Sequence, residues 1–284
     1  MQWIGRRGSS NVDDRRGISG GQVAAGGGIA GVVIYLIMTF LSGGEIDPSQ
    51  IPQLSQPAQQ TELSGEEKKA DDDRAQFVKV VLAETEDVWN KIFAESGRKY
   101  QEPTLVLFRD AVSSACGNAS AASGPFYCPA DGQVYVDLSF YKELQNRFNV
   151  SGDFPMAYVV AHEVGHHIQN LNGTAAKVNN LRGQLSETEF NRYSVKMELQ
   201  ADFLAGVWAH HTQKMKNILD PGDIEEALNA ANAIGDDNLQ KQTSGRVVPD
   251  AFTHGTSAQR IYWFKKGFTT GDINQGDTFN DPTL

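Results

Sequence analysis

Apolar residues recur every three or four positions in several stretches of the chain, and this spacing predicts amphipathic helices. In the first stretch, residues 73–95, the apolar positions Phe77, Val81 and Trp89 are separated by polar and charged residues. Further helices are predicted over residues 154–171, 186–216, 223–234 and 256–266.

Two of these helices have recognisable starts. Asp153 is a candidate N-cap for the helix 154–171, and Gly173 is typical of a residue that follows a helix. Ser186 and Glu189 form the Ser-x-x-Glu pattern of a capping box, in which each side chain bonds the other residue's backbone N–H. The middle of the chain therefore predicts two long helices with defined first turns.

Two shorter stretches, residues 104–108 and 133–140, are rich in β-branched and aromatic residues and predict strands. Because these strands come before most of the helices, the pattern favours an α+β fold. The last residues, 269–284, are rich in Gly, Asp, Asn and Thr and predict a loose C-terminal tail.

Residues 23–41 form a run of apolar or small residues without a charge, close to the roughly 20 that cross a bilayer as a helix. We interpret the run as a single transmembrane helix; a cleaved signal peptide is the alternative, although its apolar region is usually only about 7–15 residues long. Under the positive-inside rule, the preceding arginines predict a cytoplasmic N-terminus and a domain outside the cytosol. These arginines are Arg6, Arg7, Arg15 and Arg16.

Composition divides the rest of the chain. The stretch after the apolar run is rich in Ser, Gln, Pro and Gly, as flexible linkers are. The predicted parts are a cytoplasmic segment 1–22, a transmembrane helix 23–41, a linker 42–70 and an extracytoplasmic domain 71–284. The predicted location is therefore the cell membrane, with the domain on its periplasmic or extracellular side.

The two cysteines, Cys116 and Cys128, lie in a stretch of small residues that predicts a loop. An extracytoplasmic compartment would allow a disulfide between them, stabilising the fold by roughly 3 kcal/mol on the chain-entropy estimate. Two free thiols, or a pair of zinc ligands, are the alternatives.

Charge argues against nucleic acid as a partner. The 284-residue chain has a formal net charge of -10 and a pI near 5.1, whereas a phosphate backbone is bound by clustered Lys and Arg.

The sequence AHEVGHHIQN, residues 161–170, contains the pattern H-E-x-x-H. His162 and His166 are four residues apart, so on a helix both imidazoles project from one face within reach of one ion. In this pattern zinc takes the two histidines, and the glutamate between them, Glu163, serves as general base. His167 is rotated by about 100° from His166, so we expect it to be a polar neighbour and not a ligand.

A third ligand is expected on the next long helix. Glu198 would complete a His2Glu zinc site and leave the fourth position to water. Asp202, one turn further on, could accept a hydrogen bond from the far nitrogen of a zinc histidine and fix its tautomer. A solvated acidic face is the alternative for both residues. His210 and His211 lie near the end of this helix, where a histidine suits the helix dipole.

Several segments together resemble the bacterial neutral zinc metallopeptidases of the YpfJ-like family: MQWIGRRGSSNVDDRRG, SACGNASAASGPFYCPADGQVYVDLSF, AHEVGHHIQN, ELQADFLAG and THGTSAQRIYWFKKGF. H-E-x-x-H followed by E-x-x-A-D is also similar to gluzincin peptidases, including HtpX-type enzymes. The resemblance implies a zincin-like domain, with a small sheet above the active-site helix and the glutamate-bearing helix behind it. By analogy, residues 134–137 would be an edge strand that binds the substrate backbone.

The last unassigned histidine, His254, precedes the helix 256–266. It is either a polar cap of that helix or a catalytic group that donates a hydrogen bond to the oxyanion. Arg260 would then support the site by pairing with a carboxylate or with backbone carbonyls, as the similar H-x-x-x-x-x-R segment of HtpX-type enzymes implies.

The expected activity is hydrolysis of peptide bonds in a protein or peptide substrate, with one Zn²⁺ per chain and Glu163 as general base. Two other functions share most of these residues. One is a catalytically silent binding protein that keeps the zincin fold, and the other is a zinc amidase that acts on cell-wall peptides.

Overall fold

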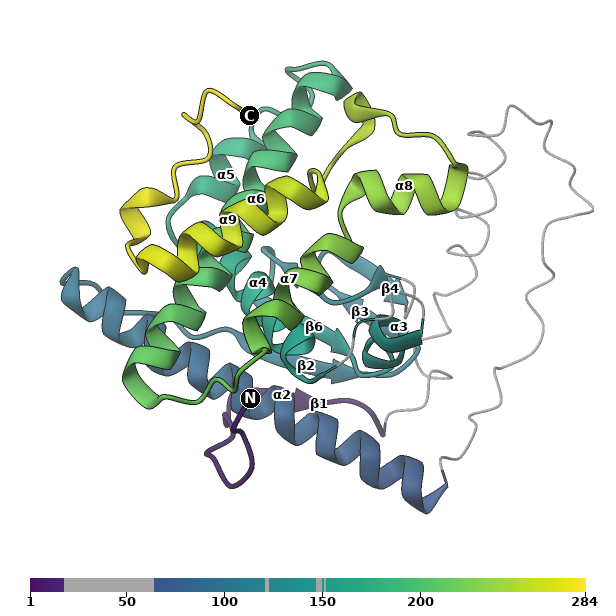
Figure 1. Ribbon diagram of the computed structural model, residues 1–284, viewed down its shortest axis with the longest axis vertical. Coiled ribbons are helices and arrows are strands. Elements are labelled where there is room, and N and C mark those ends of the chain that lie inside the picture. The colour runs from purple at the N-terminus through teal and green to yellow at the C-terminus, as the bar shows by residue number, and fades with distance from the viewer. Residues whose placement is uncertain (18–63, 121–122, 147–149, 151) are drawn as a thin grey trace, which may run out of the picture.

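The computed structural model describes residues 1–17, 64–120, 123–146, 150 and 152–284. A small mixed sheet lies beside a larger group of helices (Figure 1). The strands are β1 (Val12–Asp14), β2 (Thr104–Phe108), β3 (Ala111–Ser114), β4 (Gly117–Ser120), β5 (Phe126–Cys128) and β6 (Gln133–Asp137). The α-helices are α2 (Gly65–Glu95), α3 (Phe140–Asn146), α4 (Phe154–Leu171), α5 (Thr174–Asn179), α6 (Glu187–Lys216), α7 (Asp223–Ala233), α8 (Asp236–Ser244) and α9 (Ser257–Thr270), with 3-10 turns η3 (Pro249–Ala251) and η4 (Ile273–Gln275).

The main sheet has the strand order β1-β2-β6-β5, in which β5 alone runs antiparallel to its neighbour. Alternate side chains point to opposite faces, as the pleat of a strand requires. One face packs on the helices through Leu105, Leu107, Val134 and Val136. The other forms a separate apolar cluster that includes Val106, Phe108 and Tyr135, together with Val112 of the β3–β4 hairpin. The sheet is therefore covered on both faces.

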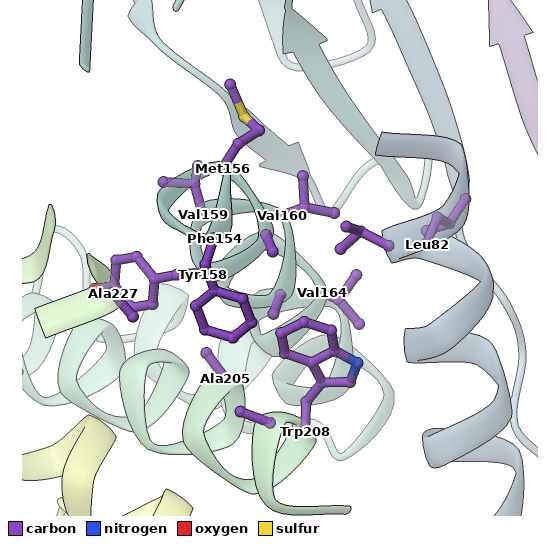
Figure 2. Close-up of a cluster of buried hydrophobic side chains, with 14 of the residues drawn as sticks. Leu82, Phe154, Met156, Tyr158, Val159, Val160, Val164, Ala205, Trp208 and Ala227 are labelled. Atoms are coloured by element: carbon purple, nitrogen blue, oxygen red, sulfur yellow. The ribbon is translucent and has the colours of Figure 1, made fainter. Parts of the chain in front are cut away.

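Helix α4 lies at the centre of the core. In Figure 2, Phe154, Tyr158 and Val164 of α4 lie among side chains of neighbouring helices, with Leu82 of α2 on one side and Trp208 of α6 below. Each large side chain that is buried in this way stabilises the fold by about 1.5–3 kcal/mol. Apolar contacts surround α4 on most sides and fix its orientation. They therefore also fix the direction in which its few polar side chains point.

Small residues let three helices approach one another closely. A Cβ atom at Gly165 of α4 would lie 3.0 Å from the carbonyl oxygen of Ala201 in α6. A Cβ atom at Gly206 of α6 would lie 2.1 Å from the carbonyl oxygen of Phe264, and one at Gly267 of α9 would meet α6 as closely. The distances at Gly206 and Gly267 leave no room for a Cβ atom, and one at Gly165 would push α4 and α6 apart by a few tenths of an ångström, so α4, α6 and α9 pack closely, backbone against backbone.

The helices expected at residues 154–171 and 186–216 are confirmed, including the capping box at Ser186 and Glu189. The first helix begins at Gly65, eight residues before its predicted start, because Ser64 and Glu67 form a second capping box. The second strand ends at Asp137, so its predicted extension to residue 140 is wrong.

The prediction that residues 134–137 form an edge strand is also wrong. They belong to β6, which lies between β2 and β5; β2 pairs with all of β6, and β5 pairs with residues 133–135. The edge of the sheet on this side is β5, a strand of three residues that is too short to stand out by its composition.

The N-terminal residues are part of the folded domain. Strand β1 pairs with β2 along residues 12–14, and the α-amino group of Met1 lies 3.1 Å from carboxylate oxygens of Asp153 and Asp223. The arginines that were expected to flank a membrane pair with carboxylates instead. These pairs are Arg6–Glu84 at 3.5 Å, Arg7–Asp87 at 2.9 Å, Arg15–Asp13 at 2.8 Å and Arg16–Asp71 at 2.5 Å.

These contacts correct both the predicted fold class and the predicted location. A single crossing between residues 17 and 64 would put β1 and β2 on opposite sides of a membrane, yet they pair in one sheet. Within the part of the chain that the structure describes, no helix combines the length and the apolar character that a membrane span needs. The predicted transmembrane helix, residues 23–41, lies outside the described residues. A single-pass membrane protein with a cytoplasmic N-terminus and an external domain is thus not supported; the fold is an α+β domain that includes residues 1–17.

The C-terminal tail is not loose. Thr278 is fully buried and its hydroxyl donates to the backbone carbonyl of Lys196 in α6 at 2.7 Å. The Lys196 ammonium donates in turn to the carbonyl of Phe279 at 3.1 Å. Residues 276–279 are therefore fastened along α6.

The packing of the N-terminal segment can be tested at Asn11, whose side-chain amide donates to the buried carboxylate of Glu86 at 2.9 Å and to Glu102 at 2.7 Å. Asn11→Ala should lower the free energy of unfolding by about 1–3 kcal/mol, because a buried carboxylate loses a donor. Urea denaturation measures the change.

The matched control is Asn90→Ala, since exposed Asn90 donates to Glu102 but not to Glu86. It should change stability by about 0.5 kcal/mol or less. Equal stability of both variants would mean that residues 1–17 do not pack as described.

Candidate metal centre

Helices α4 and α6 bring two histidines and a glutamate together. Nε2 of His162 lies 3.1 Å from Oε2 of Glu198, and Nε2 of His166 lies 3.4 Å from Oε1 of the same carboxylate. One ligand atom from each residue lies within 4.8 Å of the others. The predicted ligands therefore converge on one point, where the close contact of Gly165 with Ala201 sets the helix separation.

A buried carboxylate fixes the orientation of His162. Its Nδ1 lies 2.8 Å from Oδ1 of Asp202, which is fully buried. A carboxylate accepts hydrogen bonds, so Nδ1 carries a proton; in the neutral imidazole, the form that binds a metal, the lone pair is then on Nε2, which faces Glu198. Asp202 thus lies where its predicted role requires.

Asp202 itself is held by Arg260 and Tyr158. Arg260 donates through Nε at 2.8 Å and through a terminal nitrogen at 3.0 Å, forming a bidentate pair. The Tyr158 hydroxyl donates to Asp202 at 2.5 Å and accepts from Arg260 at 3.1 Å. Burial raises the pKa of Asp202, but Arg260 and His162 outweigh burial and hold that pKa at about 2. Asp202 is therefore ionised, and its charge is balanced by Arg260.

Glu198 is paired with the two imidazoles and not with a guanidinium. Burial lowers the pKa of His162, yet the carboxylates of Asp202 and Glu198 outweigh it and raise that pKa to about 10. Burial raises the pKa of the Glu198 carboxyl, but the adjacent imidazoles outweigh burial and hold that pKa well below its usual range. The site thus favours positive charge between these side chains. Two nitrogen donors and one carboxylate oxygen form a set that zinc accepts in catalytic sites.

Glu163 lies beside this cluster and is also buried. Burial raises the pKa of its carboxyl above the ordinary value, although His166, His162 and the backbone N–H of Tyr127 oppose the rise. A carboxylate whose pKa is raised is a stronger base than an exposed one. Its position allows it to exchange a proton with a group in the cleft.

The cluster opens into a cavity of about 590 Å³. Its polar lining includes His162, Glu163, His166, Glu198, His254 and Arg260. Apolar walls come from the edge strand β5, α3, α4 and the junction of α7 with α8, through Phe126, Tyr127, Phe140, Val159, Ile234 and Leu239. A cavity with apolar walls and a few convergent polar groups is typical of a ligand or substrate site.

His254 reaches this cavity from the loop before α9, and its side chain is half exposed. Its Nδ1 lies 2.9 Å from the Thr253 hydroxyl and 3.4 Å from a carboxylate oxygen of Asp236. The other carboxylate oxygen of Asp236 accepts backbone N–H groups of Thr253, His254 and Gly255. Asp236 therefore organises the whole loop that carries His254.

The remaining histidines lie away from the cluster. His167 donates to the carbonyl of Gln101 at 2.6 Å and lies 3.0 Å from the Tyr127 hydroxyl. His210 and His211 bond backbone carbonyls near the end of α9. Cys116 and Cys128 are joined in a disulfide, which ties the β3–β4 hairpin to strand β5.

Sequence reasoning missed Tyr158, Gln169 and Asp236. Gln169 accepts a hydrogen bond from Nδ1 of His166 at 2.9 Å. Tyr158 and Gln169 lie four residues before His162 and three after His166, so helical spacing could have placed them on the same face. For Asp236 no local pattern exists, because its partners lie 17 to 19 residues further along the chain.

Comparison with known proteins gives a consistent result. The family described as "Putative neutral zinc metallopeptidase" matches residues 1–279. The uncharacterized protein YpfJ of Escherichia coli K12 is 48% identical over 285 residues, covering 98% of this chain and 99% of its own. The uncharacterized protein Rv2575 of Mycobacterium tuberculosis H37Rv is 44% identical over 195 residues, 65% of each chain. No solved structure matches.

The family match extends over the N-terminal strand, the edge strand and both helices that carry the candidate metal ligands. The chain therefore belongs to the neutral zinc metallopeptidase family.

Proposed function

We propose that this protein is a zinc-dependent peptidase that hydrolyses peptide bonds in a protein or peptide substrate. The observation that carries the proposal is the convergence of His162, His166 and Glu198 at the floor of a cleft, with Glu163 beside them. Three protein ligands leave an open coordination position, which is the arrangement of catalytic and not of structural zinc.

One zinc ion would be held by His162, His166 and Glu198. When bound, it supplies Lewis acidity, which lowers the pKa of a coordinated water and polarises the substrate carbonyl. Support for a divalent cation comes from the donor atoms, which lie within 4.8 Å of one another, and from the carboxylate of Glu198, which faces both imidazoles.

Glu163 is the general base. Its carboxylate removes the proton from the attacking water and then delivers it to the leaving amine nitrogen. Burial in the cleft assists both steps, because a raised pKa brings the affinity of Glu163 for a proton closer to working pH. The presence of this base argues for catalysis and against a silent binding protein.

His254 is proposed as the donor to the carbonyl oxygen. Burial lowers the pKa of His254, but the nearby carboxylates of Asp236 and Glu198 outweigh burial and raise it. Because Nδ1 faces Thr253 and Asp236, Nε2–H is the group left to donate into the cleft. A protonated imidazole at this position stabilises negative charge as it develops on the oxygen.

The metal assignment predicts one zinc per chain in the wild-type protein. His166→Ala and Glu198→Ala should lose most of it, because each removes a ligand, whereas His210→Ala should keep it. Inductively coupled plasma mass spectrometry after dialysis measures the content. Full zinc in both ligand variants would overturn the assignment.

Glu163→Gln should retain zinc and lose about 10²–10⁴-fold in turnover on peptide substrates, because the amide cannot accept the proton. The matched control is Glu143→Gln, which changes a carboxylate that also lines the cleft but is not between the histidines. Turnover of Glu163→Gln at the wild-type rate would remove Glu163 from the mechanism. A wild-type chain that binds zinc but cleaves neither peptides nor proteins would identify a silent binding protein.

His254→Ala should fold and bind zinc normally while its kcat/KM falls about a hundredfold, the usual loss for one oxyanion donor. Asp236→Asn should reduce kcat/KM in the same direction, since Asp236 holds the loop and favours the protonated imidazole. If kcat/KM of His254→Ala is unchanged, His254 only caps the helix. If zinc is lost with the fold intact, His254 is a ligand and the choice of Glu198 must be reopened.

A further inference from the structure

The second metal histidine, His166, is oriented by a neutral side chain. Gln169, only 1% exposed, places Oε1 2.9 Å from Nδ1 of His166. Its amide nitrogen donates to the carbonyl of Met197 at 2.7 Å and to Oε1 of Gln200 at 3.1 Å. Every polar atom of the Gln169 side chain is therefore engaged.

These contacts determine which nitrogen of His166 carries the proton. Exchanging the oxygen and nitrogen of the Gln169 amide would set its oxygen against two acceptors, at Met197 and Gln200, so the amide has one favourable orientation. In that orientation only an oxygen faces Nδ1 of His166, which must then be protonated. In the neutral imidazole, the form that binds a metal, the lone pair of His166 is therefore on Nε2, the atom that points toward Glu198.

The hydrogen bonds continue into the C-terminal segment. The side-chain amide of Gln200 donates to the carbonyl of Gly276 at 2.9 Å. Two further bonds fasten residues 278 and 279 to Lys196, two residues before Glu198. The C-terminal segment thus holds α6 on both sides of the metal ligand.

We propose that Gln169 is a positioning residue for His166, and that Gln200 and residues 276–279 hold Gln169 in place. The inference rests on the proposed zinc site and extends it. The affinity for zinc then depends on a segment more than 70 residues from Glu198 in sequence.

His162 is oriented by a carboxylate and His166 by a neutral amide, and charge explains this difference. Asp202 can orient His162 because Arg260 balances its charge. The other hydrogen-bond partners of Gln169, the Met197 carbonyl and the Gln200 amide, are neutral, so a carboxylate in place of Gln169 would be a buried charge without a guanidinium partner of the kind that Asp202 has. A neutral amide fixes the tautomer without that cost.

The test compares Gln169→Met with wild type. Methionine has a similar length but can neither accept from His166 nor donate to Met197. Zinc dissociation constants are measured on the full chain by competition with a chromophoric chelator, and the thermal midpoint of the metal-free chain is recorded beside them. Gln169→Met should weaken zinc binding by about 10- to 100-fold, the usual effect of removing such a partner.

Three further variants separate orientation from general stability. Gln169→Glu restores an acceptor for Nδ1 and should bind zinc more tightly than Gln169→Met, although its metal-free chain should melt at a lower temperature than wild type. Gln200→Leu should show a smaller loss of affinity, because it acts through Gln169. Gln184→Met, at an exposed position, should bind zinc as wild type does.

A Gln169→Met chain that melts at a lower temperature but binds zinc with wild-type affinity would overturn the inference. The same holds if Gln169→Glu binds no better than Gln169→Met. Failure of the proposed function looks different, because the wild-type chain itself would then bind no zinc.

Discussion

The close contact between α4 and α6 is the constraint on which the rest of the site depends. Each helix carries only part of the proposed metal site, two histidines on α4 and one glutamate on α6. Gly165 lies between the two histidines of α4 and faces the backbone of Ala201, so the helices approach until Glu198 comes within 3.1 Å of His162. Gly165, which has no side chain, therefore sets the distance between the candidate metal ligands.

The packing of α4 against α6 places several charged side chains inside the protein. A third helix, α9, supplies the cation that balances the charge of Asp202. Because Gly206 and Gly267 let α9 approach α6, Arg260 forms two hydrogen bonds with Asp202. This pairing leaves Glu198 as the carboxylate that a metal cation would neutralise. In the structure Glu198 pairs with His162 and His166, one α4 residue on each side of Gly165, so the packing of α4 against α6 and the proposed zinc site are energetically linked.

Charge patterns misled the sequence interpretation at the N-terminus. Clustered arginines before an apolar run are typical of a membrane protein's cytoplasmic flank, and the same residues can pair with acidic side chains of a folded domain. Arg7 and Arg16 contact α2 through Asp87 and Asp71. Sequence alone does not distinguish the two cases, because the partners lie more than 50 residues away.

The sequence by itself determined the features that depend on local spacing. The i, i+4 histidines, the capping box at Ser186 and the extent of α4 all follow from interactions within a few residues of chain, so they could be predicted. Tertiary structure alone decided that β5 is the sheet edge, that Asp236 organises the His254 loop and that the C-terminal segment is fastened to α6. These features depend on contacts between residues distant in sequence, and such contacts form only when the packed core brings the segments together.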